Sequence, residues 1–279
     1  QASEVLQSSY DIWDDDLRKK TQDDLVRMVL VEPPEEVYRF ANSMRLDLHL
    51  LRIMWVICPS PAEKYTYGSA DRANIKYEIK KYLRANRKTG IVDTFDNCVV
   101  AFMNDDKYLE FDKDLCESLT KYLQEQYPGM ILTWCGALDS ITDAKRAYLL
   151  LEEYFPTACA IYAHKTVLTQ RELSFAGNCH DTLHKATVLP EKYRLILKPL
   201  QGRDEKTAID TLSAYLIDAD KNIAAAAKYL HVHESTVKYR LNNIKRKLGY
   251  DIAEMPGVYS LYKALALNRL LRARNNIKY

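Results

Sequence analysis

The chain has 279 residues, and its 40 lysines and arginines nearly balance its 38 aspartates and glutamates, leaving a formal net charge of +2. It contains only eight glycines, and the closest two lie seven positions apart. The dinucleotide-binding loop, the Walker phosphate loop and the Gly-x-Ser-x-Gly nucleophile elbow need closer glycines, so these motif-bearing enzyme classes are excluded.

The first part of the chain predicts helices. In DDDLRKKTQDDLVRMVLV, acidic residues precede apolar residues at near-helical spacing. The pair Pro33-Pro34 ends this helix, and EEVYRFANSMRL predicts a second one. We therefore expect an N-terminal helical segment or linker over residues 1–49.

Residues 50–165 alternate between strand and helix patterns. The predicted strands are 51–58, two strands within 89–105 that turn at Asp96-Asn97, 130–138 and 157–163; the predicted helices are 71–86, 111–127 and 140–155. This β-α-β-β-α-β order predicts a helix-covered sheet that contains an antiparallel hairpin.

The last third of the chain differs in structure and in charge. Residues 166–204 predict a mixed connector, and nearly everything from 205 onward predicts helix. Residues 222–279 hold eleven basic and three acidic residues, a balance of +8, whereas residues 1–221 hold 29 basic and 35 acidic residues, a balance of −6. This asymmetry predicts a polyanionic partner for the C-terminal end.

Within that basic region, residues 222–252 predict two helices that cross closely. Asn222 can cap the first helix, and residues 231–233 form the break. The positions that we expect to face inward are Ile223, Ala226, Ala227 and Leu230 in the first helix and Val237, Leu241, Ile244 and Leu248 in the second. The small alanines allow the two helices to approach closely. His231 stands at a turn position that glycine often holds, and histidine tolerates the positive φ angle of such a position better than most residues.

The outer face of the second helix carries mostly hydrogen-bond donors. These residues are Ser235, Lys238, Tyr239, Asn242, Lys245 and Arg246. A helix that is apolar inside and rich in donors outside suits the major groove of DNA and its phosphates. On spacing alone, the alternative is an ordinary amphipathic helix pair with a solvated basic face.

The segment resembles the C-terminal helix-turn-helix of PucR/CdaR-type bacterial transcriptional regulators. The resemblance is carried by Ala227-x-x-Leu230-x-Val232-His233-x-x-Thr236-Val237-x-Tyr239-Arg240-Leu241, then Ile244 and Leu248-Gly249, and upstream by Leu200, Asp204, Thr211, Leu212 and Tyr215-Leu216. The region before it resembles the middle part of that family, a degenerate relative of the GGDEF domain. The resemblance is strong over 193–252 and weak before it.

The resemblance implies an α+β protein in which a GGDEF-like α/β sheet domain with helices (50–165) and a connector (166–204) precede an all-α helix-turn-helix domain (205–279). It implies an effector-controlled regulator that binds a double-stranded DNA operator, as a homodimer, with an unknown small-molecule effector. The residues that it makes candidates for base edges are Glu234, Ser235 and Lys238; those for phosphate oxygens are Thr236, Tyr239, Arg240 and Lys245. His233 is expected to be a capping or turn residue.

We expect no catalytic activity, cofactor or metal. The turn that would hold the GGDEF signature is DTFDNCVV, which has no glycine pair, so Asp93 and Asp96 are predicted to be turn residues. Cys179, His180 and His184 form one local cluster without a distant fourth ligand. Two alternatives stay open: a nucleotide-cyclase-like enzyme, and an interaction module whose helical tail only dimerises.

The six cysteines lie 18 to 40 positions apart, and several occur in apolar runs. They predict reduced, buried thiols in a cytoplasmic protein, with disulfides as the minor alternative. The longest apolar stretch, near residues 50–58, contains Arg52 and is too short to cross a bilayer, so we expect no membrane partner. The first residue is Gln1, which leaves open that an N-terminal sensor domain has been removed.

Overall fold

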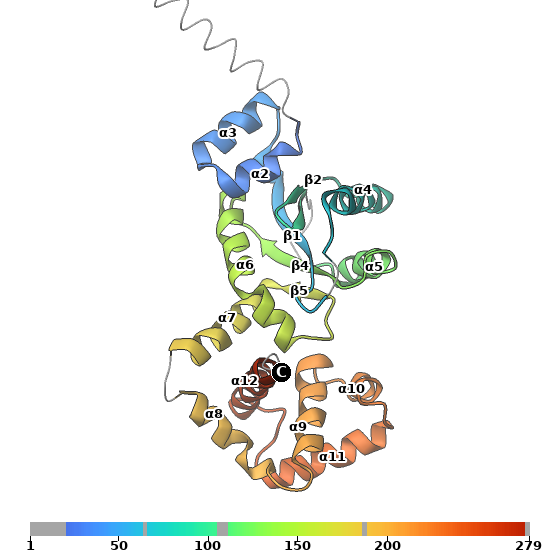
Figure 1. Cartoon of the computed structure of the whole chain (residues 1–279), viewed down its shortest axis with the longest axis vertical. Coiled ribbons are helices and arrows are strands. Elements are labelled where there is room, and N and C mark those ends of the chain that lie inside the picture. Colours follow the sequence, from blue (N-terminus) through green and yellow to red (C-terminus); the bar gives the residue numbers. More distant parts are fainter. Residues whose placement is uncertain (1–20, 64–65, 105–110, 186–188, 277–279) are drawn as a thin grey trace, which may run out of the picture. The chain divides into compact units, whose positions relative to one another are not determined.

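The computed structural model describes residues 21–63, 66–104, 111–185 and 189–276 (Figure 1). The chain forms two compact units, which are described separately. The sheet unit comprises Gln1–Glu152 and Thr166–Gln170, and the helical unit comprises Glu153–Lys165 and Arg171–Tyr279.

The sheet unit is built on five strands in the order β2-β3-β1-β4-β5. The strands are β1 (Leu51–Pro59), β2 (Gly90–Phe95), β3 (Cys98–Asn104), β4 (Met130–Ala137) and β5 (Val167–Thr169). Strand β1 runs antiparallel to both β3 and β4, β2 pairs antiparallel with β3, and β5 is parallel to β4. The first four strands have the order of the ferredoxin-like β-α-β-β-α-β unit.

Helices cover both faces of this sheet (Figure 1). In chain order they are α2 (Asp24–Val31), α3 (Pro34–Ser43), the 3₁₀ turn η1 (Leu48–Leu50), α4 (Ser69–Ala85), α5 (Lys113–Gln124), the 3₁₀ turn η2 (Ile141–Asp143) and the first part of α6 (Ala144–Ile161). Successive residues of a strand point to opposite faces, so Ile53, Trp55 and Ile57 of β1 share one face and pack with apolar residues of α4 and α5. The predicted hairpin is confirmed: β2 and β3 turn at Asp96-Asn97, where Asp96 has φ 49°.

One predicted strand is wrong. Residues 157–163 do not form a strand, because α6 continues through Pro156 to Ile161. The buried residues Phe155, Ala158 and Ile161 are spaced by three, which is helical spacing. A short apolar run gives no reliable distinction between a buried strand and a buried helix. The strand that ends the sheet, β5, lies instead in the expected connector.

The expectation of six reduced thiols is wrong for Cys58 and Cys98, which form a disulfide with Cα atoms 4.5 Å apart. The register of β1 against β3 pairs Ile57 with Val99, and the next pair along these antiparallel strands is Cys58 with Cys98. The remaining cysteines are free, and burial raises the pKa of the thiols of Cys116, Cys135 and Cys179 to about 12. For these residues the prediction of buried thiols is confirmed.

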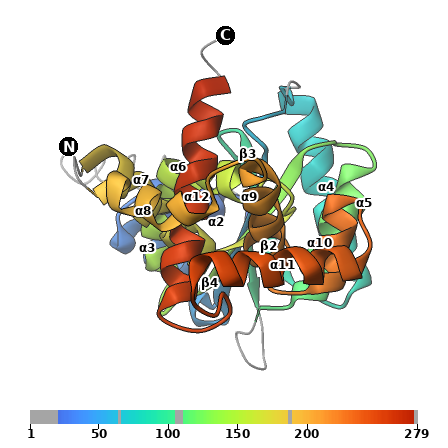
Figure 2. The same ribbon diagram turned by 90° about the horizontal axis from the view of Figure 1, so that it is seen from below.

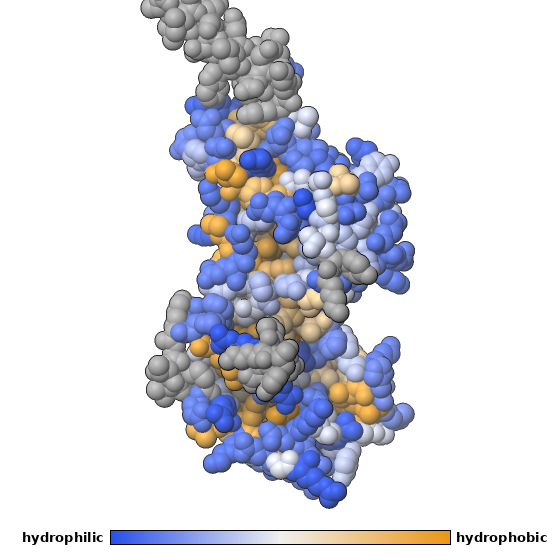
Figure 3. Space-filling view, in the orientation of Figure 1, coloured by the Kyte–Doolittle hydropathy of each residue, from blue (hydrophilic) through white to orange (hydrophobic). Residues whose placement is uncertain are grey.

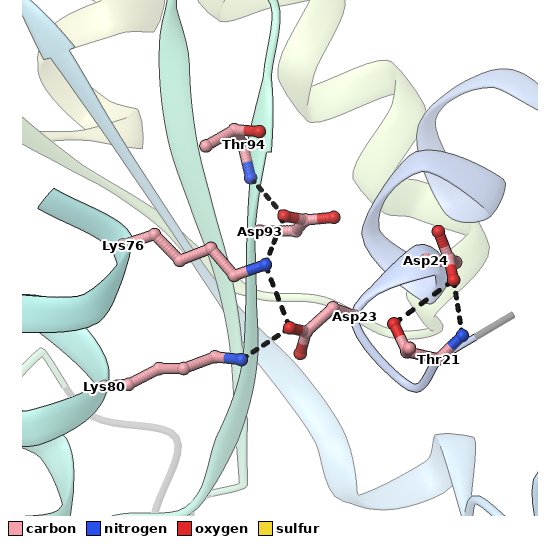
Figure 4. Close-up of polar contacts among 7 residues, drawn as sticks. All are labelled: Thr21, Asp23, Asp24, Lys76, Lys80, Asp93 and Thr94. Carbon is pink, nitrogen blue, oxygen red and sulfur yellow. Dashed lines mark hydrogen bonds and ion pairs between the residues drawn. The ribbon is translucent and has the colours of Figure 1, made fainter. Parts of the chain in front are cut away.

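Within the sheet unit, an ion-pair cluster attaches α2 to α4 and β2 (Figure 4). Lys80 donates to Asp23 at 2.5 Å, and Lys76 lies 2.9 Å from Asp23 and 2.7 Å from Asp93. Asp93 also accepts from the backbone N–H of Thr94 at 2.8 Å. The four charged side chains are only about a quarter exposed. Because they come from the start of α2, from α4 and from β2, their ion pairs join these three elements.

The helical unit consists of the second half of α6 and the helices that follow it (Figure 2). These are α7 (Gln170–Lys185), α8 (Leu189–Leu197), the 3₁₀ turn η3 (Lys198–Leu200), α9 (Glu205–Ser213), the π-helical turn η4 (Ala214–Asp218), α10 (Ile223–Leu230), α11 (Glu234–Leu248) and α12 (Gly257–Asn276). Among the described residues no helix is both long and apolar enough to span a membrane.

The α+β class expected from the sequence is confirmed, with a sheet unit followed by helices. The expected connector holds β5, α7 and α8, and the N-terminal helices α2 and α3 belong to the sheet unit. The two compact units are defined by contacts within the chain and do not test domain boundaries. The four-part division at 49, 165 and 204 therefore stays a prediction. Residues 1–20 of the expected N-terminal segment lie outside the described residues.

Candidate nucleic-acid interface

Helix α10 is bounded by two local features of its sequence. At its start the Asn222 side chain accepts a hydrogen bond from the Ala225 N–H at 3.0 Å, which is the predicted cap. At its end His231 has the left-handed backbone angles φ 52° and ψ 44°, and its N–H donates to the carbonyls of Ala227 and Lys228. The expectation that this histidine replaces the usual turn glycine is confirmed.

Helix α11 begins after a histidine cap. Nδ1 of His233 accepts a hydrogen bond from the Ser235 backbone N–H at 3.3 Å and lies 2.9 Å from the Ser235 hydroxyl oxygen. His233 is therefore an N-cap, as expected. Gly249, with φ 79°, ends the helix. These two signals define a 15-residue helix whose first turn carries Glu234.

The predicted apolar stripe lies inside the unit. Val237, Leu241 and Ile244 of α11 are buried, and Leu248 is half-buried. They face α10, where Ala226 and Ala227 are buried, and α9, which contributes Ala208, Ile209 and Leu212. The close crossing of α10 and α11 thus depends on alanine side chains, and it fixes which face of α11 is left outside.

Opposite the stripe α11 presents a polar ridge, defined as Ser235, Tyr239, Asn242 and Arg246. Their spacings of 4, 3 and 4 place them along one line of the helix, and all four are exposed. Tyr239 is 66% exposed, although it is a large aromatic residue. The surface over α11 is mainly hydrophilic in Figure 3. A helix with one buried apolar face and an exposed polar face opposite can enter the major groove of DNA.

The seven residues predicted to contact DNA all lie on α11 outside its buried stripe, on the ridge or on its two flanks. Glu234, Ser235, Lys238, Tyr239 and Lys245 are exposed, and Thr236 and Arg240 are half-buried. Their accessibility meets the requirement for contact with DNA. It does not assign individual contacts, which stay predictions.

Lys245 differs from the other predicted cations because it is paired. Its Nζ donates to the carboxylate of Asp251, which also accepts from the Ala253 backbone N–H at 3.0 Å. The hydrogen bond with Asp251 raises the pKa of Lys245, and that from Lys245 lowers the pKa of Asp251. The pair connects α11 to the loop that follows it.

Two hollows flank the ridge. The α9-side hollow, of about 540 Å³, lies between α11 and the start of α9 and includes Arg240 and Lys247 in its wall. The loop-side hollow, of about 780 Å³, includes Lys245, Tyr250 and Asp251. Tyr239, Asn243 and Arg246 line both hollows, so α11 stands out between two depressions.

The sequence-based selection of contacts omitted four residues that the structure places at this surface. They are Asn242, Asn243, Arg246 and Lys247. The signal was available, because 239, 242 and 246 continue the ridge from 235, and 243 and 247 continue the line of 236 and 240. The Arg246 side chain is oriented by a hydrogen bond to the amide oxygen of Asn243.

The residues considered for other chemistry have structural partners. Asp93 is paired with Lys76, and the hydroxyl of Tyr148 lies 3.5 Å from Asp96, which is in the β2-β3 turn. The rings of His180 and His184 lie 4.3 Å apart. Among the described residues, no group of three or more histidine, cysteine, aspartate or glutamate side chains is placed to hold a metal ion.

Comparison with known families decides the nature of the helices around α11. Residues 208–267 match the model of the PucR C-terminal helix-turn-helix domain. This segment is a PucR-type helix-turn-helix domain. The PucR-type domain comprises most of α9, then η4, α10 and α11, and the first half of α12. The match to this family supports the assignment of the chain as a transcriptional regulator that binds DNA.

Other comparisons add little. A crystal structure described as a regulator of polyketide synthase expression from Bifidobacterium adolescentis aligns with 91% of this chain and 96% of that chain, at 18% identity and a TM-score of 0.38. A TM-score this low supports no conclusion about this chain. No curated protein matches its sequence.

Proposed function

We propose that this chain regulates transcription by placing α11 of its PucR-type domain in the major groove of a specific operator. The observation that carries the proposal is the distribution of apolar and polar side chains around α11. Its apolar stripe is buried against α9 and α10, and its opposite ridge is exposed and polar. The match over 208–267 supports the same role.

The N-terminal part of α11 supplies the proposed base contacts, because that end of a recognition helix usually approaches the base edges. Ser235 and Lys238 are exposed there and can donate to acceptor atoms of bases. Glu234 is also exposed, and its carboxylate can accept only from a donor such as cytosine N4. Thr236, Tyr239 and Arg240 are proposed to contact phosphate oxygens.

A fluorescence anisotropy titration with duplex DNA at several salt concentrations tests this function. A DNA-binding protein shows affinity that falls linearly with salt on logarithmic axes, even on random duplex. On an operator selected from a random library, Lys238→Ala is expected to lose about 1–3 kcal/mol of binding free energy at one base pair if Lys238 contacts a base. Lys121→Ala, an exposed lysine of α5 in the sheet unit, is the matched control.

Two outcomes oppose the proposal. Absence of salt-dependent DNA binding would favour the alternative of an interaction module whose helices only dimerise. Turnover of GTP in the presence of magnesium would favour a nucleotide-cyclase-like enzyme, although Asp93 is held by Lys76.

Homodimer formation, control by a small-molecule effector, a degenerate GGDEF-like character of the sheet unit and a cytoplasmic location complete the proposal. The first three rest on the sequence resemblance, and the location rests on the expectation of reduced thiols, which holds for the described cysteines other than Cys58 and Cys98.

A further inference from the structure

The α9-side hollow is a candidate anion site beside the proposed recognition helix. It lies between the first turn of α9 and the flank of α11. Its charged and polar lining residues are Asp204, Thr207, Tyr239, Arg240, Arg246 and Lys247. The three cations outnumber the one carboxylate, so the hollow attracts negative charge.

The cations of this hollow are available for a ligand. In the part of the chain that the structure describes, no carboxylate forms an ion pair with Arg240 or Lys247. Lys247 is exposed and Arg240 is half-buried, and they lie seven residues apart on one line of α11. Two cations about two helical turns apart are about 10 Å apart along the axis, enough for two anionic groups of one extended strand.

The loop-side hollow has the opposite character. Its Lys245 is bound to Asp251, so the two charges largely cancel where a phosphate would lie. Arg246 belongs to both hollows. The two sides of α11 are therefore unequal, and the α9 side offers more uncompensated positive charge.

The floor of the α9-side hollow is apolar. Ile244 and Ala208 line it and are 3% and 7% exposed, and the aromatic ring of Tyr239 stands at its edge. The hydroxyl of Thr207, which is exposed in the first turn of α9, adds a hydrogen-bond donor. An apolar floor with donors at the rim fits a sugar–phosphate strand, whose deoxyribose is apolar and whose phosphates are charged.

We propose that the α9-side hollow holds a sugar–phosphate segment of the operator, with Arg240 and Lys247 donating to its phosphate oxygens, and that Lys245 instead positions the loop after α11. This inference rests on the proposed function and adds to it the side of α11 on which the DNA backbone is held. It makes Lys247 a DNA contact and removes Lys245 from the phosphate contacts.

Two variants, one on α11 and one that joins α11 to the following loop, test the proposal in the full chain. Lys247→Gln is expected to weaken binding equally on operator and random duplex and to make the salt slope shallower by about one. That slope corresponds to a loss of about eightfold in affinity at 0.1 M salt. The control is Lys245→Gln combined with Asp251→Asn, which removes the loop pair without leaving an unpaired carboxylate. It is expected to stay within twofold of wild type.

Neutral groups in the DNA backbone identify the phosphate that Lys247 is proposed to contact. Single methylphosphonate substitutions are scanned along the selected operator with wild type and with Lys247→Gln. The proposal expects one position at which neutralising the phosphate weakens wild type but not the variant. Circular dichroism of both variants shows whether they retain the helical content of the wild type.

Several outcomes overturn the inference. Wild-type affinity and salt slope in Lys247→Gln, with loss of binding in Lys238→Ala, would refute the α9-side contact and leave the proposed function intact. A loss in the Lys245 and Asp251 double variant equal to that in Lys247→Gln would refute the inequality of the two sides. Binding of inorganic phosphate to the free chain that Lys247→Gln abolishes, with DNA affinity unchanged, would assign the hollow to a free anion. Absence of salt-dependent binding by wild type would instead refute the proposed function.

Discussion

His231 shows how one residue sets the geometry of the helix pair. It ends α10 in the left-handed region, and its N–H closes the last turn of that helix. A β-carbon in this conformation costs free energy that glycine avoids, on the order of 1 kcal/mol. Since the turn residues 231–233 are all that separates α10 from α11, this backbone conformation determines how α11 leaves α10.

His231→Gly is therefore expected to raise the free energy of unfolding by up to about 1 kcal/mol, because relief of the left-handed strain exceeds the added entropy of the unfolded chain. His231→Val is expected to lower it by a larger amount, because a β-branched side chain tolerates this conformation poorly. Urea unfolding followed by circular dichroism measures both. A destabilised His231→Gly variant would show that the imidazole contributes contacts that outweigh the strain.

The cluster of Asp23, Lys76, Lys80 and Asp93 holds α2 against α4 and β2. Burial raises the pKa of Asp23, but the hydrogen bonds from Lys80 and Lys76 outweigh burial and hold the pKa below its ordinary value of 3.8. Burial lowers the pKa of Lys76, but the bonds to Asp93 and Asp23 outweigh it and raise the pKa above 10.5. Asp23 and Lys76 are thus both ionised over a wide range of pH.

The pH dependence follows from these directions. A lowered carboxyl pKa stabilises the folded state above its unfolded value, and the contribution is lost as the pH falls through the folded pKa. Asp23→Asn is therefore expected to be less stable than wild type at neutral pH, and the difference is expected to shrink as the pH falls below about 4. Urea midpoints between pH 3 and pH 8 measure this difference.

Glu117→Gln is the control for the Asp23 variant. Glu117 lies 3.6 Å from Lys113 on the surface of α5, and both side chains are more than half exposed. Exposed pairs contribute about 0–1 kcal/mol, so this variant should stay close to wild type throughout. A stability difference for Asp23→Asn that is equally large at pH 3 would show that α2 is not held by the charge of Asp23.

A buried ion pair connects three segments of the helical unit. Arg269 of α12 donates to Asp218 at the end of η4 through two bonds of 2.8 and 2.5 Å, and to the carbonyl of Ile161 at the end of α6 at 2.6 Å. The Asp218 side chain is 3% exposed. Removing one partner leaves a buried charge unpaired, so Arg269→Met is expected to destabilise the helical unit by about 3–5 kcal/mol.

The same helix supplies the control for Arg269. Arg272 lies 3.5 Å from Asp210, and both side chains are nearly half exposed. Arg272→Met is expected to cost less than about 1 kcal/mol. Thermal unfolding followed at the signal of the helical unit separates the two variants. Equal losses would show that the bonds of Arg269 add nothing beyond a surface ion pair.

Elements whose signals are local could be predicted from the sequence. The hairpin at Asp96-Asn97 and the pair α10 and α11 follow from residues within one turn or one helical repeat, and both are confirmed. Outcomes that depend on distant neighbours could not be predicted. The Cys58–Cys98 disulfide requires the register of β1 against β3, and the helical state of residues 157–161 requires the packing of α6.

The site could be predicted for the same reason, but only in part. Spacing along α11 was sufficient to separate the buried stripe from the ridge. It did not show that Asp251 neutralises Lys245 or that the start of α9 forms a hollow with Lys247, because both partners come from other segments. The sequence therefore identified the helix but not the partners of its cations.

The proposed function gives each chain one recognition helix, α11. If one α11 covers one half-site, a palindromic operator requires two chains related by a two-fold axis. If the chain binds as a homodimer, operators selected from a random library are expected to be inverted repeats. Their half-site centres should be about 10–10.5 base pairs apart, or a multiple of that distance.

Stoichiometry tests this prediction independently of sequence preference. Sedimentation velocity of the full chain with a selected operator should show two chains per duplex, and scrambling one half-site should weaken binding of both chains together. A single asymmetric site occupied by one chain would contradict the dimer and leave DNA binding in place. The loss on scrambling should grow as salt is raised, because salt screens the sequence-independent attraction between the basic C-terminal region and the scrambled half-site.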